Sequence, residues 1–240
     1  MFKAVLFDLD GTLLNINMDQ FLKQYFRKMQ EMAVSQGFTG VERLVQQIML
    51  STDAMIKNLD PGLRNQEVFE RDFYQHWHYP HHEFQKFFER FYREGFPQLK
   101  QYTRPFTGVP EMLEEVFNKG YKVVIATNAV FPMTALIQRL EWAGLGQFPF
   151  DLITSYENMH FCKPQIQYYE EICQIIDTEP DQCLMVGNDV GEDIIASKLG
   201  MKTFLVENLL IDRGEGFTPD WRGSLDHLFM FIRELTGVAK

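Results

Sequence analysis

The chain has 240 residues, of which 45% are hydrophobic and 23% are charged, and its formal net charge at pH 7 is −10. This size and apolar content suffice for one α/β domain with an insertion. The negative charge disfavours binding along a nucleic-acid backbone, because no net positive field attracts phosphates. The apolar runs are shorter than a membrane span, no secretory leader is evident, and three cysteines form no paired framework. We therefore expect a cytoplasmic protein that is a monomer or homodimer.

The first predicted strand delivers two carboxylates into a tight turn. The apolar run at 4–7 is followed by Asp8, Asp10, Gly11 and Thr12. In open α/β sheets ligands bind at the carboxyl ends of strands, so Asp8 lies where chemistry is usually done, and Asp10 follows on the same side if the chain stays extended. An acidic turn without function is the alternative, which this short motif alone does not exclude.

Two later stretches place phosphate-binding candidates near strand exits. A β-branched run at 123–126 ends at Thr127 and Asn128, where a hydroxyl and free backbone N–H groups suit a phosphate oxygen. Lys163 stands just before Pro164, at the predicted start of a helix, and can neutralise a bound anion. Each has a bland alternative, since Thr127 can cap a helix and Lys163 can be a solvated lysine.

A third strand, at 183–187, ends in a second acidic cluster. It breaks at Gly187 and is followed by Asp189 and Asp193, which share one face if a helix begins there. Favourable charges in a first helical turn are the alternative explanation. The combination, in this order and always at or just after a strand, favours a single active site over four separate coincidences.

These four stretches resemble the motifs of the haloacid dehalogenase superfamily. The resemblance covers residues 2–14 and about 105–207. It implies that Asp8 is a nucleophile that becomes an aspartyl-phosphate and that Asp10 is the acid/base. It also implies phosphate binding by Thr127 and Lys163, beside which we place Asn128.

The resemblance further implies a Mg²⁺ site. Its ligands would be Asp8, the carbonyl of Asp10 and Asp189, while Asp193 would act through a water molecule. All-oxygen ligands with retained waters favour Mg²⁺ over zinc. Two departures from the family pattern stand out, namely Asn188 before Asp189 and the bulky run 160–162 before the lysine.

We therefore predict a Mg²⁺-dependent phosphomonoesterase that acts on a small phosphorylated metabolite. A phosphotransferase or phosphomutase acting on a sugar phosphate would use the same aspartyl-phosphate and is the alternative. Weaker alternatives are a 2-haloacid dehalogenase, which needs no acid two residues after its nucleophile, and a non-catalytic interaction protein. The sequence does not identify the substrate.

Alternating strands and helices predict a Rossmann-like parallel sheet with helices on both faces, built from residues 1–14 and 105–240. We expect later strands at 121–126, 151–154, 183–187 and 203–206. We expect helices from Pro110 to before Gly120, at 132–143, from Lys163 to about 176, up to Gly200, and at 224–236.

Residues 15–104 differ because they show helical periodicity without strand signals. We expect four helices near 18–35, 41–58, 65–78 and 81–95. The resemblance implies that this all-α insertion is a cap that closes over the phosphate site. Its first residues, Asn15, Asn17, Asp19 and Gln20, are placed to touch the leaving group or, equally, to form a hinge or helix cap.

Aromatic residues recur at helical spacing in the insertion, as Phe69, Phe73 and Trp77 and again as Phe84, Phe87, Phe88 and Phe91. A bundle core is the favoured interpretation, and a stacking wall for a flavin or nucleobase is the alternative. Four histidines, His76, His78, His81 and His82, lack a standard zinc spacing, and their role stays open.

Overall fold

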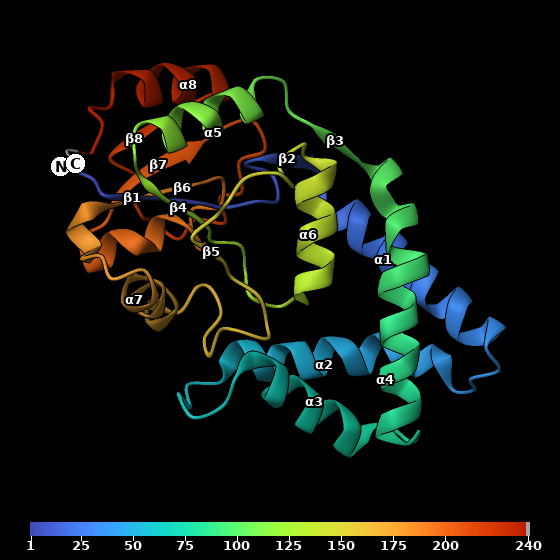
Figure 1. Cartoon of the computed structure of the whole chain (residues 1–240). Coiled ribbons are helices and arrows are strands. Elements are labelled where there is room, and N and C mark those ends of the chain that lie inside the picture. Colours follow the sequence, from blue (N-terminus) through green and yellow to red (C-terminus); the bar gives the residue numbers. More distant parts are fainter. Residues whose placement is uncertain (239–240) are drawn as a thin grey trace.

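A six-stranded, wholly parallel sheet forms the centre of the molecule in the computed structural model, which describes residues 1–238 (Figure 1). The strand order is β5-β4-β1-β6-β7-β8. The strands are β1 (Ala4–Phe7), β4 (Lys122–Ile125), β5 (Leu152–Ile153), β6 (Cys183–Gly187), β7 (Lys202–Val206) and β8 (Trp221–Gly223). Strand β1 therefore lies in the middle, between β4 and β6.

Helices cover both faces of this sheet (Figure 1). On one face lie α5 (Val109–Asn118) and α8 (Leu225–Glu234), and on the other lie α7 (Ile166–Ile175) and a 3₁₀ helix (Ile194–Leu199). Alternate residues of β1 enter different hydrophobic clusters, because side chains of a strand point to opposite faces. This arrangement confirms the predicted Rossmann-like core.

The register of the sheet aligns the ends of three strands. Phe7 at the end of β1 pairs with Ile125 of β4 and with Val186 of β6. The backbone N–H of Asp8 donates to the carbonyl of Val186 at 2.9 Å, so pairing continues to the first residue after β1. Residues that follow these three strands consequently meet at one edge of the sheet.

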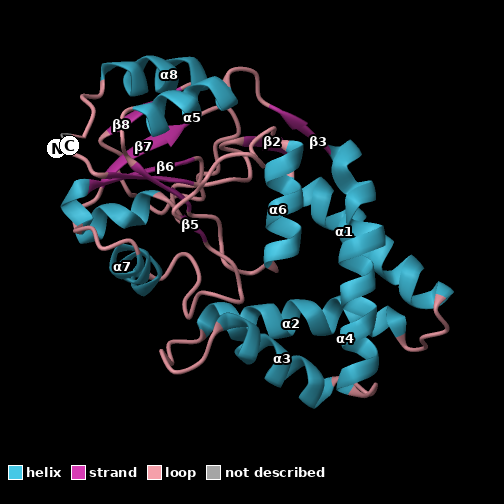
Figure 2. Cartoon of the chain, in the orientation of Figure 1, coloured by secondary structure: helices cyan, strands magenta, loops and turns pink. Residues whose placement is uncertain are grey.

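Residues 18–102 form a helical segment without strands (Figure 2). It contains α1 (Met18–Ser35), a 3₁₀ turn (Val41–Arg43), α2 (Leu44–Lys57), α3 (Asn65–His76) and α4 (His81–Arg90). Each helix lies close to its predicted range. Helix α4 continues through a π turn (Phe91–Gly95) and a 3₁₀ helix (Phe96–Tyr102), so the chain stays helical beyond the predicted end at 95.

Three short strands were not predicted. β2 (Leu14–Ile16) and β3 (Thr103–Pro105) form an antiparallel ribbon that leads into and out of the helical segment. The predicted domain boundaries at 14/15 and 104/105 fall within this ribbon. The ribbon and β8 are each only three residues long, so no periodicity marks them. Similarly, the helix expected before Gly200 is a 3₁₀ helix.

Helix α6 (Met133–Trp142) lies between the sheet and the helical segment (Figure 1). Its Trp142 stacks on Phe96 at a ring separation of 5.3 Å and contacts Phe21 of α1. These contacts join the two parts of the chain into one continuous hydrophobic cluster. Within residues 1–238, no helix is both long and apolar enough to cross a membrane.

Candidate functional site

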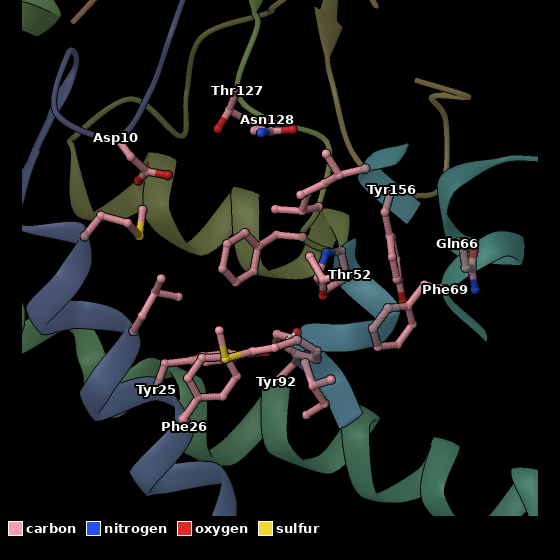
Figure 3. Close-up of a pocket in the computed structure, with 18 of the residues that line it drawn as sticks. Asp10, Tyr25, Phe26, Thr52, Gln66, Phe69, Tyr92, Thr127, Asn128 and Tyr156 are labelled. Atoms are coloured by element: carbon pink, nitrogen blue, oxygen red, sulfur yellow. Dashed lines mark hydrogen bonds between the residues drawn. The ribbon is translucent and has the colours of Figure 1, made fainter. Parts of the chain in front are cut away.

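The three aligned strand ends form the floor of a cavity of about 1040 Å³. The helical segment and α6 supply its walls, and Figure 3 shows Asp10, Thr127 and Asn128 projecting into it. The predicted site residues on this floor are Asp8, Asp10, Thr127, Asn128, Asp189 and Asp193. Fold formation thus gathers residues from positions 8 to 193 in one place.

Lys163 lies beneath the floor, where it joins two of the floor carboxylates without itself lining the cavity. Its Nζ donates to Asp8 Oδ1 at 3.0 Å and to Asp193 Oδ1 at 2.6 Å, and its side chain is fully buried. Burial alone would lower the pKa of Lys163, but Asp193 and Asp8 raise it well above its ordinary value. The lysine is therefore charged, and it orients the Asp8 carboxylate from one side.

The other oxygen of Asp8 accepts a hydrogen bond from Thr12. Thr12 Oγ1 lies 3.1 Å from Asp8 Oδ2 and 2.9 Å from Asn188 Oδ1. The amide of Asn188 in turn donates to the carbonyl of Leu209 at 2.6 Å. The unusual asparagine before Asp189 therefore has a specific structural function, since it connects the first motif to the loop after β7.

The loop after β6 holds its two carboxylates by backbone groups. Asp189 Oδ1 accepts from the N–H groups of Gly191 and Glu192, both at 2.9 Å. Asp193 Oδ2 accepts from the N–H of Asp189 at 2.9 Å. Asp193 consequently contacts both Lys163 and the backbone of Asp189, which makes it the link between the lysine and the acidic loop.

Asp10 forms an ion pair with Arg139 of α6. The Arg139 side chain has no exposed surface, and its guanidinium carbon lies 4.4 Å from the centre of the Phe131 ring. Burial raises the pKa of Asp10, although Arg139 acts in the opposite direction. Asp10 Oδ1 has no hydrogen-bond partner within the described part of the chain and lies at the cavity floor.

The family model for haloacid dehalogenase-like hydrolases matches residues 5–206, which include every one of the predicted site residues. The chain belongs to this family. The match confirms the resemblance inferred from the four motifs, and with it the expectation of a hydrolase.

Relatives of this family member include phosphatases. The chain is 26% identical to pyrophosphatase PpaX of Halalkalibacterium halodurans over 223 residues, which cover 91% of this chain and 90% of that protein. It is 30% identical to glyceraldehyde 3-phosphate phosphatase of Methanothermobacter thermautotrophicus over 110 residues, which cover 45% of this chain and 47% of that protein.

Solved structures of the family share the fold. A phosphatase from Thermococcus onnurineus superposes with a TM-score of 0.62 at 20% identity, covering 98% of this chain and 100% of that one. An L-2-haloacid dehalogenase superposes with a TM-score of 0.57 at 16% identity, covering 97% and 100%. The fold is therefore common to phosphatases and dehalogenases, and the site has to distinguish them.

Two arginines of this family member were not found by the motif analysis. Arg139 lies within the predicted helix 132–143, on the apolar side together with Leu136 and Leu140, and a charge on an apolar face is a signal for a buried partner. Arg213 lies in the loop after β7 and donates to Asp189 Oδ2 at 2.8 Å. Nothing in the sequence around Arg213 indicates that contact.

The phosphate-binding candidates differ in how firmly they are held. The carbonyl of Thr127 accepts from Thr154 Oγ1 and from the Tyr168 hydroxyl, both at 2.7 Å. The amide of Asn128 donates to the Lys163 carbonyl at 3.4 Å and to Glu192 Oε2 at 3.3 Å. Both residues line the cavity, so their predicted contact with phosphate stays open to test.

The bulky run before Lys163 packs against the helical segment. Cys162 is buried with Met55 of α2 and Val68 of α3. The amide of Asn65, at the start of α3, donates to the carbonyls of Phe161 at 3.1 Å and Ala129 at 3.3 Å. The run therefore positions the lysine loop beneath the helices and leaves the cavity floor free.

The first residues of the insertion were expected either to touch the leaving group or to form a hinge or helix cap, and they differ in position. Asn17 caps α1, because its side chain accepts from the N–H of Gln20 at 2.9 Å. Asp19 lines the cavity. Asn15, in β2, is exposed.

The aromatic residues divide similarly. Phe73, Trp77, Phe84, Phe87 and Phe91 are buried, which agrees with a bundle core. Phe69 and Phe88 lie instead on the cavity wall.

The predicted oxygen donors for a cation are the carboxylates of Asp8 and Asp189 and the carbonyl of Asp10. In the structure the Asp8 carboxylate contacts Lys163 and Thr12, and Asp189 Oδ2 contacts Arg213. Mg²⁺ typically uses one or two protein carboxylates and completes its shell with waters and substrate phosphate. Within residues 1–238 no cluster of three His, Cys, Asp or Glu side chains is arranged to hold a metal, and the four histidines of the insertion do not form one. The predicted all-oxygen donor set would suit Mg²⁺ better than zinc.

Proposed function

We propose that this protein is a Mg²⁺-dependent phosphomonoesterase that forms an aspartyl-phosphate on Asp8. The observation that carries the proposal is the environment of the Asp8 carboxylate, which is held by Lys163 on one oxygen and by Thr12 on the other at the floor of a cavity. A carboxylate fixed in this way is suited to in-line attack on phosphorus. The phosphatases among its relatives support the same reaction class.

In the first step, an Asp8 oxygen forms a bond to phosphorus while the ester P–O bond breaks. Asp10 supplies the proton that the leaving alkoxide needs; burial raises the pKa of Asp10, and the contact with Arg139 holds its carboxyl group in position. In the second step Asp10 removes a proton from the water that attacks the aspartyl-phosphate. Inorganic phosphate leaves and Asp8 is restored.

Lys163, Thr127 and Asn128 would bind the phosphate oxygens, since the lysine is charged and the other two line the floor. Asp8, Asp189 and the Asp10 carbonyl would hold the Mg²⁺. When bound, this ion would offset the negative charge of the phosphate and of the attacking carboxylate. Asp193 would keep Lys163 and the Asp189 backbone in place through its two hydrogen bonds.

Residues 15–104 would act as the cap domain and residues 1–14 and 105–240 as the catalytic domain. The ribbon of β2 and β3 would be the connection between them. A cap over the floor would exclude water from the reacting phosphate and supply the contacts to the leaving group. The substrate would be a small phosphorylated metabolite.

Phosphate release by the purified protein tests the proposal. We expect turnover of 4-nitrophenyl phosphate with Mg²⁺, loss of turnover with a chelator, and loss in Asp8→Asn. Undiminished turnover in Asp8→Asn would exclude the mechanism. Release of one inorganic phosphate for each ester consumed indicates hydrolysis, whereas formation of an isomerised sugar phosphate would indicate a phosphomutase. Halide release from a 2-haloacid would indicate the dehalogenase, against which the acid at position 10 argues.

A further inference from the structure

The upper part of the cavity is a pocket with an aromatic and aliphatic wall. It is lined by residues of α1 to α4, of the π turn, of the turn before α6 and of the loop after β5. We call it the upper pocket because it lies beyond the floor; in the view of Figure 3 it is drawn below Asp10 and Thr127. Its aromatic members are Tyr25, Phe26, Phe69, Tyr74, Phe88, Tyr92, Phe131 and Tyr156. Such a surface binds apolar or aromatic groups by removing their area from water.

Negative charge predominates around the upper pocket. Asp19, Asp53, Glu70 and Glu89 of the four helices line it, and of these Asp53 is paired with Lys57 at 2.7 Å. Like-charge proximity raises the free energy of any anion that enters, and low-dielectric aromatic walls weaken the screening of that repulsion.

The cations at the cavity border are already paired. Arg93 donates to Glu94 at 3.2 Å and its side chain is 68% exposed. Arg213 contacts Asp189 at 2.8 Å and is 60% exposed. Across residues 1–238 the lining of this cavity includes no other lysine or arginine, and Lys163 below it is bound to two carboxylates. A second phosphate or a carboxylate on the substrate would therefore compete with these carboxylates for a cationic partner.

The volume of the cavity also bears on the identity of the leaving group. Ligand pockets in proteins have volumes of about 300–1000 Å³, and this cavity of about 1040 Å³ is large for a phosphate with a two- or three-carbon alcohol. A leaving group with at least one ring, or with an equivalent apolar chain, would occupy this space and cover the aromatic wall. The upper pocket therefore differs in chemistry from a site for pyrophosphate, whose leaving group is itself an anion.

On the basis of the phosphatase function proposed above, we propose that the substrate is a phosphate monoester of an aromatic or apolar alcohol that carries no negative charge. The floor binds the phosphate, and the upper pocket binds the ring or apolar chain of the alcohol. The acidic residues of the helices select against carboxylated and diphosphorylated esters.

A series of esters with primary alkoxide leaving groups tests this proposal, because it varies the group in the pocket more than the chemistry at phosphorus. We expect kcat/KM for 2-phenylethyl phosphate to exceed that for ethyl phosphate by about tenfold or more, as burial of a phenyl ring would produce. We expect phosphoglycolate and propane-1,3-diyl bisphosphate, which add a carboxylate or a second phosphate to a primary alkoxide ester, to be poorer substrates than ethyl phosphate. Equal values, or a preference for either anionic compound, would overturn the proposal.

Two substitutions place the selectivity in the upper pocket. Thr52→Lys adds a cation beside the aromatic wall and should raise kcat/KM for phosphoglycolate relative to 2-phenylethyl phosphate (Figure 3). Leu50→Lys is the matched control, because Leu50 lies on the same helix, is 55% exposed and does not line the cavity. Phe69→Ala should lower the ratio of the 2-phenylethyl value to the ethyl value by about tenfold.

The outcomes separate this inference from the function on which it rests. If no ester of the series releases phosphate in an Asp8-dependent manner, the phosphatase proposal itself is wrong. If turnover depends on Asp8 but favours the anionic compounds, or if Thr52→Lys changes selectivity no more than Leu50→Lys does, only the inference about the leaving group is wrong.

Discussion

Arg139 neutralises Asp10 from a position 129 residues later in the chain, and the arginine side chain has no contact with solvent. The pair connects α6 to the turn after β1. Arg139 Nε and Nη2 have no further partners within residues 1–238. Asp10 is therefore the carboxylate that compensates the buried charge of Arg139. In turn, α6 holds the side chain of the proposed acid/base in place through Arg139.

Loss of one partner of this pair should destabilise the fold. In Arg139→Met, Asp10 keeps a buried carboxyl group without a counter-ion, and we expect the free energy of unfolding to fall by about 3–5 kcal/mol. The double variant with Asp10→Asn should lose less than the sum of the two single variants, because each single variant leaves one buried charge unpaired and the double variant leaves none. Urea unfolding of the four proteins measures this coupling.

An exposed ion pair is the control for that cycle. Arg233 lies 3.6 Å from Glu115 and is 73% exposed, so Arg233→Met should change the free energy of unfolding by less than about 1 kcal/mol. Additive effects at Arg139 and Asp10 would contradict the proposed dependence of one on the other.

Asp189→Asn should weaken metal binding without unfolding the protein. The substitution removes one of the two carboxylates proposed for Mg²⁺ but keeps a side chain that fits the same space. We expect the Mg²⁺ concentration for half-maximal phosphate release to rise about tenfold or more, since loss of a ligand's charge reduces affinity for a hard cation. Titration of activity with Mg²⁺ after chelation provides the measurement, with the exposed Asp226→Asn as control. An unchanged requirement for Mg²⁺ would remove Asp189 from the metal site.

Gly187→Ala should reduce activity through Asp193. A Cβ at position 187 would overlap the carboxyl group of Asp193, which is packed directly against the glycine. Because Asp193 also binds Lys163, we expect its displacement to move the lysine away from Asp8 and to lower kcat by about 10²-fold, as misplacement near 1 Å can do. Circular dichroism establishes whether the variant is folded. A folded variant with full kcat would show that Asp193 does not position Lys163.

Asn65→Ala should loosen the contact between α3 and the catalytic loops. The buried Asn65 amide donates to two carbonyls, one near Asn128 and one near Lys163, and both acceptors lose this partner in the variant. We expect a loss of about 1–3 kcal/mol in the free energy of unfolding, together with a lower kcat/KM.

Asn58→Ala is the comparison for Asn65, because its amide makes an exposed hydrogen bond to the carbonyl of Asp60. It should change the free energy of unfolding by no more than about 0.5 kcal/mol. Equal stability of the Asn65 and Asn58 variants would show that the docking contact contributes nothing.

The sequence alone identified the family, the alternation of strands and helices, and the residues at the ends of β1, β4 and β6. These features depend on the local amino-acid sequence. Apolar runs form strands, helical periodicity forms helices, and a residue after a parallel strand lies at the sheet edge whatever its neighbours are. The sequence thus places Asp8, Thr127 and Asp189 each at the end of a strand, whereas their gathering on one floor also requires that β4 and β6 pair with β1 in register.

Only the tertiary structure decided which distant partners these residues have. The pairing of Arg139 with Asp10, of Arg213 with Asp189 and of Thr12 with Asn188 depends on how helices and loops pack around the sheet, and no local pattern encodes it. The same holds for the ribbon of β2 and β3, which is too short to show a period. The division of the aromatic residues between core and cavity wall was likewise decided by packing, because one helical spacing fits both environments.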